Sequence, residues 1–399
     1  MSRPPRPHPL ARAPLVDRLN GWLEGLWEKG WASRPSLDPA ELWRKGSAGQ
    51  RAEDEFSARS EEDAEDFRLR IDRLASSLHT EAQLNPLGLT MAHGQLVRAI
   101  RHRFQLGRLW REKPELLEDD LAPPILVVGH MRSGTTRVHR LLAADPAHAA
   151  TRFCDSWHPV PRSPDFRPMW SAMALGLAHR LDPWLDTLHP FGATRPDEEL
   201  GWLATSLDHC AYEAQWHVPS FISFSEQRDP APVYREFHRL LKTDAHWHGN
   251  AGRPRVLKVP QFAEDLPALL AELPDARTVR TAREAEDVLD SAVSLVANQR
   301  TIQSDETDSG EIREECARKM ALRETRMDQA LAGLGQQGHA QIAFAALDSD
   351  WQSAVQTLYA DLGLPLTPDA LAAMERECAR SASGAHRHHA RSLTRFARA

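Results

Sequence analysis

The sequence predicts an α/β fold, in which a parallel sheet is flanked by helices on both faces. The part of the chain from about residue 122 contains short apolar runs of the β type, and each run is followed by a helical pattern. This alternation is typical of a parallel sheet, because parallel neighbours need a crossover connection. The predicted strands are Ile125–Val128, Arg255–Val259, Ala276–Thr281 and Gln341–Leu347.

The residues before this part predict an N-terminal helical region packed on the core. From residue 15 to 121, apolar side chains such as Phe67 and Ile71 recur at helical spacing within charged stretches. Two consecutive prolines at 123 and 124 mark the boundary with the α/β domain, which we place at 122–399. Residues 1–14 are basic and rich in proline, so we expect a short disordered lead.

A long stretch between Thr151 and Asn250 interrupts the alternation of strands and helices. It is rich in tryptophan, histidine and proline and carries weak strand signals. In folds of this class such an insertion is usually helical and shapes the substrate pocket. Four tryptophans of this stretch are candidates for apolar pocket walls, although each by itself is more typical of a core: Trp157, Trp184, Trp202 and Trp216.

Composition and charge exclude several functional classes. The chain has 399 residues and a formal net charge of −7, which gives no reason to expect a bulk nucleic-acid-binding protein. No apolar run reaches the roughly 20 residues of a transmembrane helix. The N-terminus lacks the apolar core of a secretory signal, and the four scattered cysteines form no Cys-x-x-Cys pair. We therefore expect a cytoplasmic protein with reduced thiols.

The stretch ILVVGHMRSGTTRVHRLLAADP, which begins at Ile125, predicts a binding site for an anion. A buried strand leads into a loop from Gly129 to Gly134, and a helix begins near Thr135. The unpaired N–H groups and the dipole at a helix start attract negative charge. The loop and the helix start also offer hydroxyl donors and a guanidinium that can bind two oxygens at once: Arg132, Ser133, Thr135 and Thr136.

The residue after the second glycine of this loop argues against a nucleoside triphosphatase. Such enzymes carry a lysine there, which reaches the outer phosphates, and a following hydroxyl that holds magnesium. In this chain Thr135 takes that position, and the positive residue, Arg132, precedes the glycine. This order suits a terminal phosphate monoester bound without a metal and disfavours a kinase.

Two sequence blocks together resemble the sulfotransferase family. The first, PILVVGHMRSGTTRVHRLLAADP, resembles the family's 5′-phosphosulfate-binding loop in its broad bacterial branch. The second contains TVRTAREAEDVLDSAVSLV and is similar to a block in which a serine follows a strand-end arginine by eight residues. Arg283 and Ser291 have this spacing. The similarity extends from about Ala122 to Phe396.

This resemblance implies a reaction and a set of binding residues. The reaction moves a sulfuryl group from 3′-phosphoadenosine 5′-phosphosulfate (PAPS) to a hydroxyl or amine of a small-molecule, lipid or glycan acceptor. The loop residues Arg132–Thr136, including Gly134, correspond to those that bind the 5′-phosphosulfate in the family. Arg283 and Ser291 correspond to the pair that holds the 3′-phosphate. Lys258 matches the lysine of the family's Leu-Lys-x-Pro motif and would be a second cation, and no metal is implied.

The general base is less well marked. Family members carry a histidine two or four residues after that lysine, whereas this chain has Pro260 and Phe262. The segment LHPFGATRPDEEL resembles a family block in which a histidine precedes a Pro-x-Glu cluster. It makes His189 the candidate base, while Glu198 or Glu199 could orient its imidazole or act as the base.

One departure from the family pattern leaves an alternative open. Relatives usually read Thr-His-Arg-Asp-Pro where this chain reads TAREA, so that Ala282, Glu284 and Ala285 surround a retained Arg283. A protein of the same fold that binds PAPS or its desulfated product without turnover is the alternative. The C-terminal histidines predict a polar loop near the nucleotide rather than a metal site, since they lack partners at ligand spacing: His386, His388 and His389.

Overall fold

A computed structural model describes residues 6, 10–334 and 338–381 of the chain. Most of the predicted disordered lead and the three C-terminal histidines lie outside these described residues. Within them, no helix is long and apolar enough to cross a membrane. All four cysteines fall within the described part of the chain, and all four are free thiols.

A five-stranded parallel sheet forms the centre of the α/β part, as the sequence predicts. The strand order is β2-β3-β1-β4-β5, and every neighbouring pair is parallel. The strands are β1 (Ile125–Val128), β2 (Ala149–Ala150), β3 (Arg255–Leu257), β4 (Arg277–Ala282) and β5 (His339–Ala343). The two-residue strand β2 was not predicted, because two alanines after a turn carry no strand signal of their own.

The last predicted strand is partly wrong. The structure ends β5 at Ala343 and starts a helix, α15 (Phe344–Ser349), where the sequence predicts a strand that continues to Leu347. Two alanines after Phe344 favour a helix, and Leu347 reaches the core at helical spacing from Phe344. The change of element brings Phe344 to the carboxyl end of the sheet.

Helices cover both faces of the sheet, and alternate residues of β1 show why. Ile125 and Val127 pack in a cluster with residues of helices on one face, namely α5 (Thr135–Ala144), α16 (Trp351–Asp361) and α17 (Pro368–Ser381). Leu126 and Val128 point the other way, because side chains alternate along a strand. They join a second cluster with α11 (Ala231–Trp247) and α12 (Phe262–Glu272).

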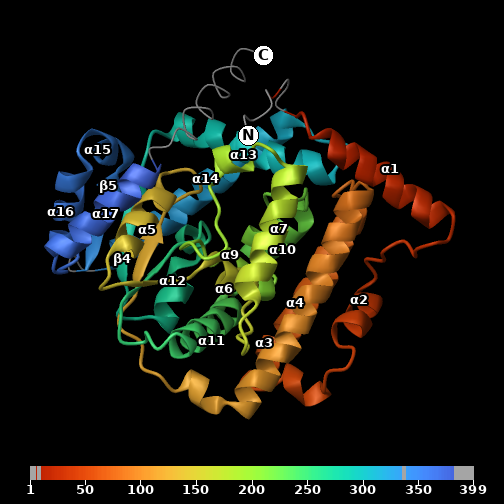
Figure 1. Cartoon of the computed structure of the whole chain (residues 1–399), viewed down its shortest axis with the longest axis horizontal. Helices are drawn as coiled ribbons and strands as arrows, with labels where there is room; N and C mark the ends of the chain where they lie inside the picture. Colours follow the sequence, from red (N-terminus) through yellow and green to blue (C-terminus); the bar gives the residue numbers. More distant parts are fainter. Residues whose placement is uncertain (1–5, 7–9, 335–337, 382–399) are drawn as a thin grey trace.

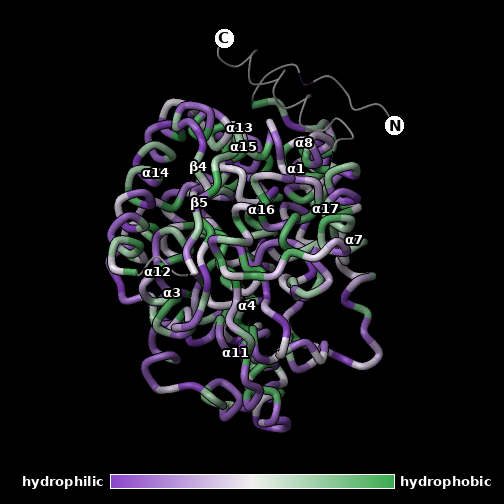
Figure 2. Tube along the Cα trace, turned by 90° about the vertical axis from the view of Figure 1, so that its left-hand side faces the viewer, coloured by the Kyte–Doolittle hydropathy of each residue, from purple (hydrophilic) through white to green (hydrophobic). Residues whose placement is uncertain are grey.

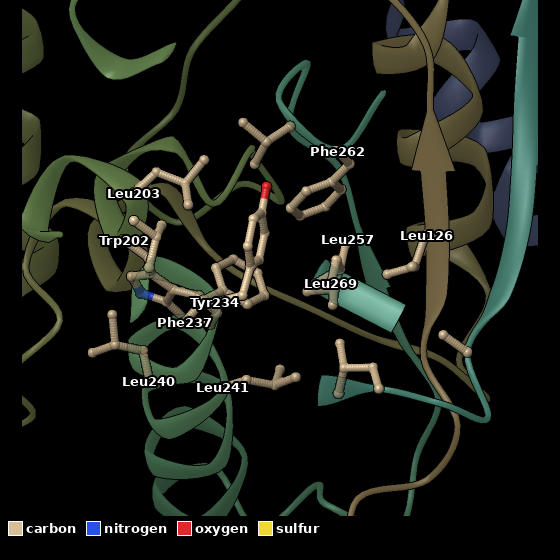
Figure 3. Packing of buried hydrophobic residues seen from close by; sticks show 14 of the residues in the cluster. Leu126, Trp202, Leu203, Tyr234, Phe237, Leu240, Leu241, Leu257, Phe262 and Leu269 are labelled. Atoms are coloured by element: carbon tan, nitrogen blue, oxygen red, sulfur yellow. The ribbon is translucent and has the colours of Figure 1, made fainter. Parts of the chain in front are cut away.

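The second cluster is the larger of the two clusters that flank the sheet. Figure 3 shows Leu126 and Leu257 of the strands facing Phe262, while Tyr234 and Phe237 approach from α11. The rings of Phe237 and Phe262 meet edge to face, with centroids 5.6 Å apart. The hydropathy of the chain follows this arrangement, since hydrophilic segments dominate the periphery of the molecule in Figure 2.

The stretch between β2 and β3 is helical, and the N-terminal helices pack against it. Leu96 and Ile100 of the N-terminal part share a buried cluster with Trp216 and Phe221 of this stretch. In Figure 1 the N-terminal helices lie on the side of the molecule opposite the sheet edge β5. The N-terminal elements are α1 (Pro14–Glu28), α2 (Pro39–Gly46), η1 (Ala52–Glu55), α3 (Glu61–Thr80), α4 (Pro86–Glu112) and η2 (Pro114–Leu117).

The remaining helices complete the insertion and the outer layer. The insertion before α11 contains α6 (Phe153–Trp157), α7 (Arg167–Leu181), α8 (Leu185–Leu188), α9 (Leu200–Thr205), η3 (His209–Ala211) and α10 (Pro219–Glu226). Between β4 and β5 lie α13 (Ala285–Gln303) and α14 (Ser309–Ala332). Two of the tryptophans considered as pocket walls, Trp202 and Trp216, are fully buried core residues, whereas Trp157 and Trp184 are half-buried.

Candidate active site

The loop between β1 and α5 has the tight conformation that its two glycines predict. Gly129 and Gly134 both have positive φ, at 154° and 101°. A side chain at Gly129 would place its Cβ 2.4 Å from Thr281 Oγ1, and one at Gly134 would place it 2.6 Å from the ring of Phe344. The helix begins at Thr135, as predicted. The glycines therefore let the loop lie close to β4 and α15.

The side chain of Ser133 holds the loop in place. Its hydroxyl donates to the carbonyl of His130 over 2.7 Å and lies 2.7 Å from Thr281 Oγ1 on β4. The side chain is buried. Since both contacts are internal, Ser133 shapes the loop, and the donors that remain for an anion come from its neighbours.

Arg132 spans from the loop to two other parts of the site. Its backbone has a φ of 70°, and its Nε donates to Ser291 Oγ over 2.8 Å. Nη1 donates to the carbonyl of Leu188 over 2.7 Å. Burial, together with the nearby Arg283, lowers the pKa of Arg132 to about 10. The guanidinium thus remains charged at neutral pH inside the protein.

Arg283 lies against the same loop. It follows β4, and its Nη1 donates to the backbone carbonyl of Arg132 over 3.1 Å. Its guanidinium covers the ring of Phe344 at 4.7 Å. The two residues that follow it in the TAREA stretch, Glu284 and Ala285, are exposed. The departure from the family pattern therefore leaves Arg283 beside Arg132, and through Arg132 beside Ser291.

A buried lysine adds another cation at the start of α5. Lys258 follows β3, and its Nζ donates to Thr136 Oγ1 over 3.1 Å. The same ammonium hydrogen-bonds to the carboxylate of Glu198. Its backbone N–H donates to Glu199 Oε2 over 2.9 Å. Lys258 therefore connects Thr136 of the loop helix with the acidic pair that the sequence singled out.

The two acidic residues have different surroundings. Glu199 is completely buried, and this burial raises the pKa of its carboxyl to about 8. It holds the end of β3 through the N–H of Lys258. Glu198 is half-buried and is neutralised by the Lys258 ammonium. A group that is already paired, or that is protonated and buried, is a poor acceptor for a proton from a substrate.

His189 is held by a carboxylate that the sequence did not single out. Its Nε2 lies 3.0 Å from Asp197 Oδ1, and its Nδ1 lies 3.9 Å from Glu198 Oε1. Although burial opposes it, the interaction with His189 lowers the pKa of Asp197 to about 2. Asp197 is thus a carboxylate that can only accept, so Nε2 carries the hydrogen and Nδ1 keeps a free lone pair.

Two guanidiniums fix the backbone on either side of His189. Arg132 donates to the carbonyl of Leu188, and Arg140 of α5 donates to the carbonyl of Pro190 over 2.6 Å. Both arginines come from the loop and helix that follow β1. The position of the imidazole is therefore tied to the loop between β1 and α5, which lies more than forty residues earlier in the sequence.

The same cluster offers ligand atoms for a cation. Oxygen and nitrogen atoms of His189, Asp197 and Glu198 lie within 4.8 Å of one another. The ammonium of Lys258 is already bonded to Glu198 and supplies positive charge at this point. In this cluster the ammonium of Lys258 takes the place that a bound cation would have beside Glu198.

A comparison with models of protein families identifies the chain. The model described as "Sulfotransferase family" matches residues 123–368, which include the loop, Lys258, Arg283 and Ser291. The chain belongs to the sulfotransferase family. No curated protein sequence matches it.

Solved structures agree with this assignment. This sulfotransferase is similar to the sulfotransferase STF1 from Mycobacterium tuberculosis, with 27% identity and a TM-score of 0.77, over 86% of this chain and 93% of that one. Its fold is also shared with the sulfotransferase STF9 from Mycobacterium avium, at 19% identity and a TM-score of 0.75, over 86% and 88% of the two chains.

The structure of this sulfotransferase brings most of the predicted site residues together and adds others. Arg132, Arg283 and Ser291 meet at one place, and Thr136, Lys258, Glu198 and His189 form a connected row beside them. Sequence reasoning missed Asp197, the carbonyl of Leu188, and Phe344. Asp197 could have been found in the sequence, because it stands directly before Glu198 in the same acidic run. The carbonyl of Leu188 and the ring of Phe344 have no signature in the sequence.

Proposed function

We propose that this sulfotransferase moves a sulfuryl group from PAPS to an acceptor hydroxyl or amine by in-line displacement. The observation that carries the proposal is the meeting of Arg132, Arg283 and Ser291 at the N-terminus of α5. Two guanidiniums, a hydroxyl and free helix N–H groups are what two phosphate groups on one nucleotide require. The family supplies the identity of the donor.

The charge of Arg132 fits an anionic donor such as PAPS. Among the described residues, Arg132 has no carboxylate within ion-pair distance, and its side chain is half-buried, which lowers its pKa. A buried cation is costly unless an anion or several acceptors compensate it. Ser291 and the carbonyl of Leu188 compensate only in part, so a phosphate or sulfate oxygen is a favourable further partner for Arg132.

The chemical step exchanges one bond to sulfur for another. The acceptor oxygen forms a bond to sulfur while the bond from sulfur to the bridging oxygen of the donor breaks, and the departing nucleotide keeps the electron pair. Negative charge grows on that bridging oxygen. Arg132 and Lys258 stabilise this charge, and the hydroxyl of Thr136, bonded to Lys258, helps to orient it.

His189 takes the proton of the acceptor. Asp197 holds the hydrogen on Nε2, so that Nδ1 is the free base, and the carboxylate stabilises the imidazolium that forms. Glu198 is neutralised by Lys258 and orients that lysine instead. Glu199 is buried against the backbone and fixes the end of β3.

Transfer of labelled sulfate tests this proposal. The purified protein is incubated with PAPS labelled in the sulfate and with a panel of phenols, alcohols, amines, glycans and lipids. We expect label in at least one acceptor, and its loss in His189→Ala. Binding of 3′-phosphoadenosine 5′-phosphate (PAP) without transfer to any acceptor would instead support the non-catalytic alternative.

A further inference from the structure

Helix α7 has an apolar face that nothing covers within the described part of the chain. From Pro168 to Ala178 its sequence, PMWSAMALGLA, has no charged residue. Ser171 and Leu175 pack inward, while the opposite side is exposed. A helix that is apolar all round is normally buried on all sides. The exposed residues, which we call the α7 face, are Phe166 (48% exposed), Met169 (50%), Trp170 (38%), Met173 (68%) and Leu177 (52%).

The exposed residues of the α7 face are contiguous, unlike the single apolar side chains that are scattered over most protein surfaces. The five residues follow the helical spacing i, i+3, i+4, i+7 and i+11, so they form one continuous stripe. Figure 2 places α7 at the edge of the molecule, away from the central core. The stripe is therefore open to a partner.

A basic patch adjoins one end of the α7 face. Arg98 and Arg101 of α4, together with Arg162, have no carboxylate within ion-pair distance among the described residues. Burial and these arginines hold the pKa of His102 well below its usual range. The ring of His158 meets Trp170 edge-on at 5.9 Å, and burial together with Arg98 and Arg167 lowers the pKa of His158 to about 4. The positive field thus reaches the start of the stripe.

We propose that the α7 face and the basic patch together bind the surface of an anionic lipid bilayer. Tryptophan, phenylalanine, methionine and leucine along one side of a helix, with arginines beside them, match the needs of an interfacial helix. The apolar side chains enter the acyl boundary, and the arginines meet the anionic headgroups.

A second copy of the chain suits this face less well than a bilayer. A two-fold dimer through the stripe would bring two copies of the basic patch to one interface, where the nearby carboxylate of Asp165 is already paired with Arg167. An anionic bilayer supplies the missing negative charge.

The docking surface is continuous with the candidate active site through a row of half-buried aromatic rings. Arg98 lies 5.8 Å above the ring of Trp157, which is 6.2 Å from Phe153. Phe153 is 5.6 Å from Phe191, and Phe191 is 4.4 Å from His189. If the sulfuryl transfer proposed above holds, this row favours an amphiphilic acceptor carried in the same bilayer.

Sedimentation with lipid vesicles tests the docking without any nucleotide, so its outcome is independent of the proposed reaction. The full chain is mixed with phosphatidylcholine vesicles, with or without about one third phosphatidylglycerol, at low and high salt. We expect binding to the anionic vesicles, roughly tenfold weaker binding to neutral ones, and weakening by salt, since the arginine contribution is screened.

Matched variants locate the binding surface. Met169→Gln/Met173→Gln should remove most of the binding to both kinds of vesicle. Arg101→Glu/Arg162→Glu should weaken binding to anionic vesicles by at least about tenfold, since each basic residue near an anionic surface contributes roughly fivefold. Phe56→Ser and Arg376→Glu are the controls, because both residues are exposed and lie outside the α7 face and the basic patch. Both controls should bind as the parent does.

Three results would overturn the proposal. The parent protein could fail to bind either vesicle, or the α7 variants could bind like the parent. The parent could also form a dimer in solution that Met169→Gln/Met173→Gln dissolves, which would assign the face to a second copy. Unchanged thermal unfolding of each variant shows that the fold is intact, so that a loss of binding reports on the surface.

Discussion

Arg132 Nε donates a hydrogen bond of 2.8 Å to Ser291 Oγ, although the two residues are far apart in sequence. The same guanidinium donates to the carbonyl of Leu188, directly before His189. One side chain therefore connects the loop between β1 and α5, the helix α13 and the segment that carries the candidate base. We infer that occupation of the loop and the position of His189 are coupled through Arg132.

The first prediction concerns the shape of the Arg132 side chain. A lysine keeps the charge, but its single ammonium cannot reproduce the planar fork that reaches Ser291 and Leu188. We expect Arg132→Lys to weaken PAP binding by about tenfold and Arg132→Ala by about a hundredfold, as one or two charge-assisted hydrogen bonds are lost. Calorimetric titration measures both. Arg280→Lys is the control and should bind normally, because Arg280 of β4 is paired with Glu324 and Asp328 of α14. Parent-like binding by Arg132→Lys would contradict the role of the fork.

A second prediction separates the candidate bases. His189→Ala should lower kcat by roughly 10² to 10⁴, the range of a lost general base. Glu198→Gln should have a smaller effect, because it removes the partner of Lys258 and leaves the imidazole in place. A larger loss in Glu198→Gln than in His189→Ala would show that the carboxylate is the base.

The pH dependence of the rate tests the role of Asp197. Because the pKa of Asp197 is held at about 2, its carboxylate stays ionised wherever the enzyme works. It stabilises the charged imidazole, so Asp197→Asn should move the acid limb of the pH–rate profile to lower pH and also reduce kcat. A profile that keeps its acid limb while only the maximal rate falls would mean that Asp197 has a purely structural role.

A fourth prediction concerns Gly134. Alanine there must adopt a φ of 101° and place its Cβ 2.6 Å from Phe344. We expect Gly134→Ala to reduce the free energy of unfolding by about 1 to 3 kcal/mol and to weaken PAP binding. Gly94→Ala is the control: it lies in helix α4 with open space around its Cα, and should be neutral or stabilising by up to about 1 kcal/mol. Equal denaturation midpoints for the two variants would contradict this account of the loop.

A fifth prediction follows from the buried carboxyl of Glu199. Its pKa is about 8 in the folded protein and about 4.3 in an unfolded chain. Between these values the folded state holds a proton that the unfolded state has released, so stability falls as the pH rises. Glu199→Gln removes this dependence, and we expect the slope of unfolding free energy against pH between 5 and 8 to become less negative by about 1 kcal/mol per unit. Denaturant titrations at several pH values measure the slopes; identical slopes would exclude a protonated Glu199.

The sequence predicted those parts of the site that depend on local patterns. The strand Ile125–Val128 and the helix that begins at Thr135 follow from the order of apolar residues, glycines and hydroxyls. That Arg283 and Ser291 serve one phosphate is expected only from the family resemblance, since spacing along the chain does not fix the position of separate elements. The hydrogen bond from Arg132 to Ser291 is a finding of the structure. The sequence predicts a strand at Phe344, because a run of six apolar residues fits either element.

Other features could not be read from the sequence for a physical reason. The role of Asp197 depends on how close its oxygen lies to His189, which the sequence does not give. The group of Leu188 that accepts from Arg132 is a backbone carbonyl, which every residue has. Both contacts depend on how the α8 segment folds over the loop. The α7 face differs from these contacts, because its apolar residues are visible in the sequence. Only the structure shows that they are exposed.

The most direct test of the central claim is a calorimetric titration of the protein with PAP and, separately, with ATP and magnesium. The account predicts one PAP site per chain, much weaker binding of ATP, and PAP binding weakened by about a hundredfold in both Arg132→Ala and Arg283→Ala. Tighter binding of ATP with magnesium than of PAP, or parent-like PAP binding in both variants, would contradict it.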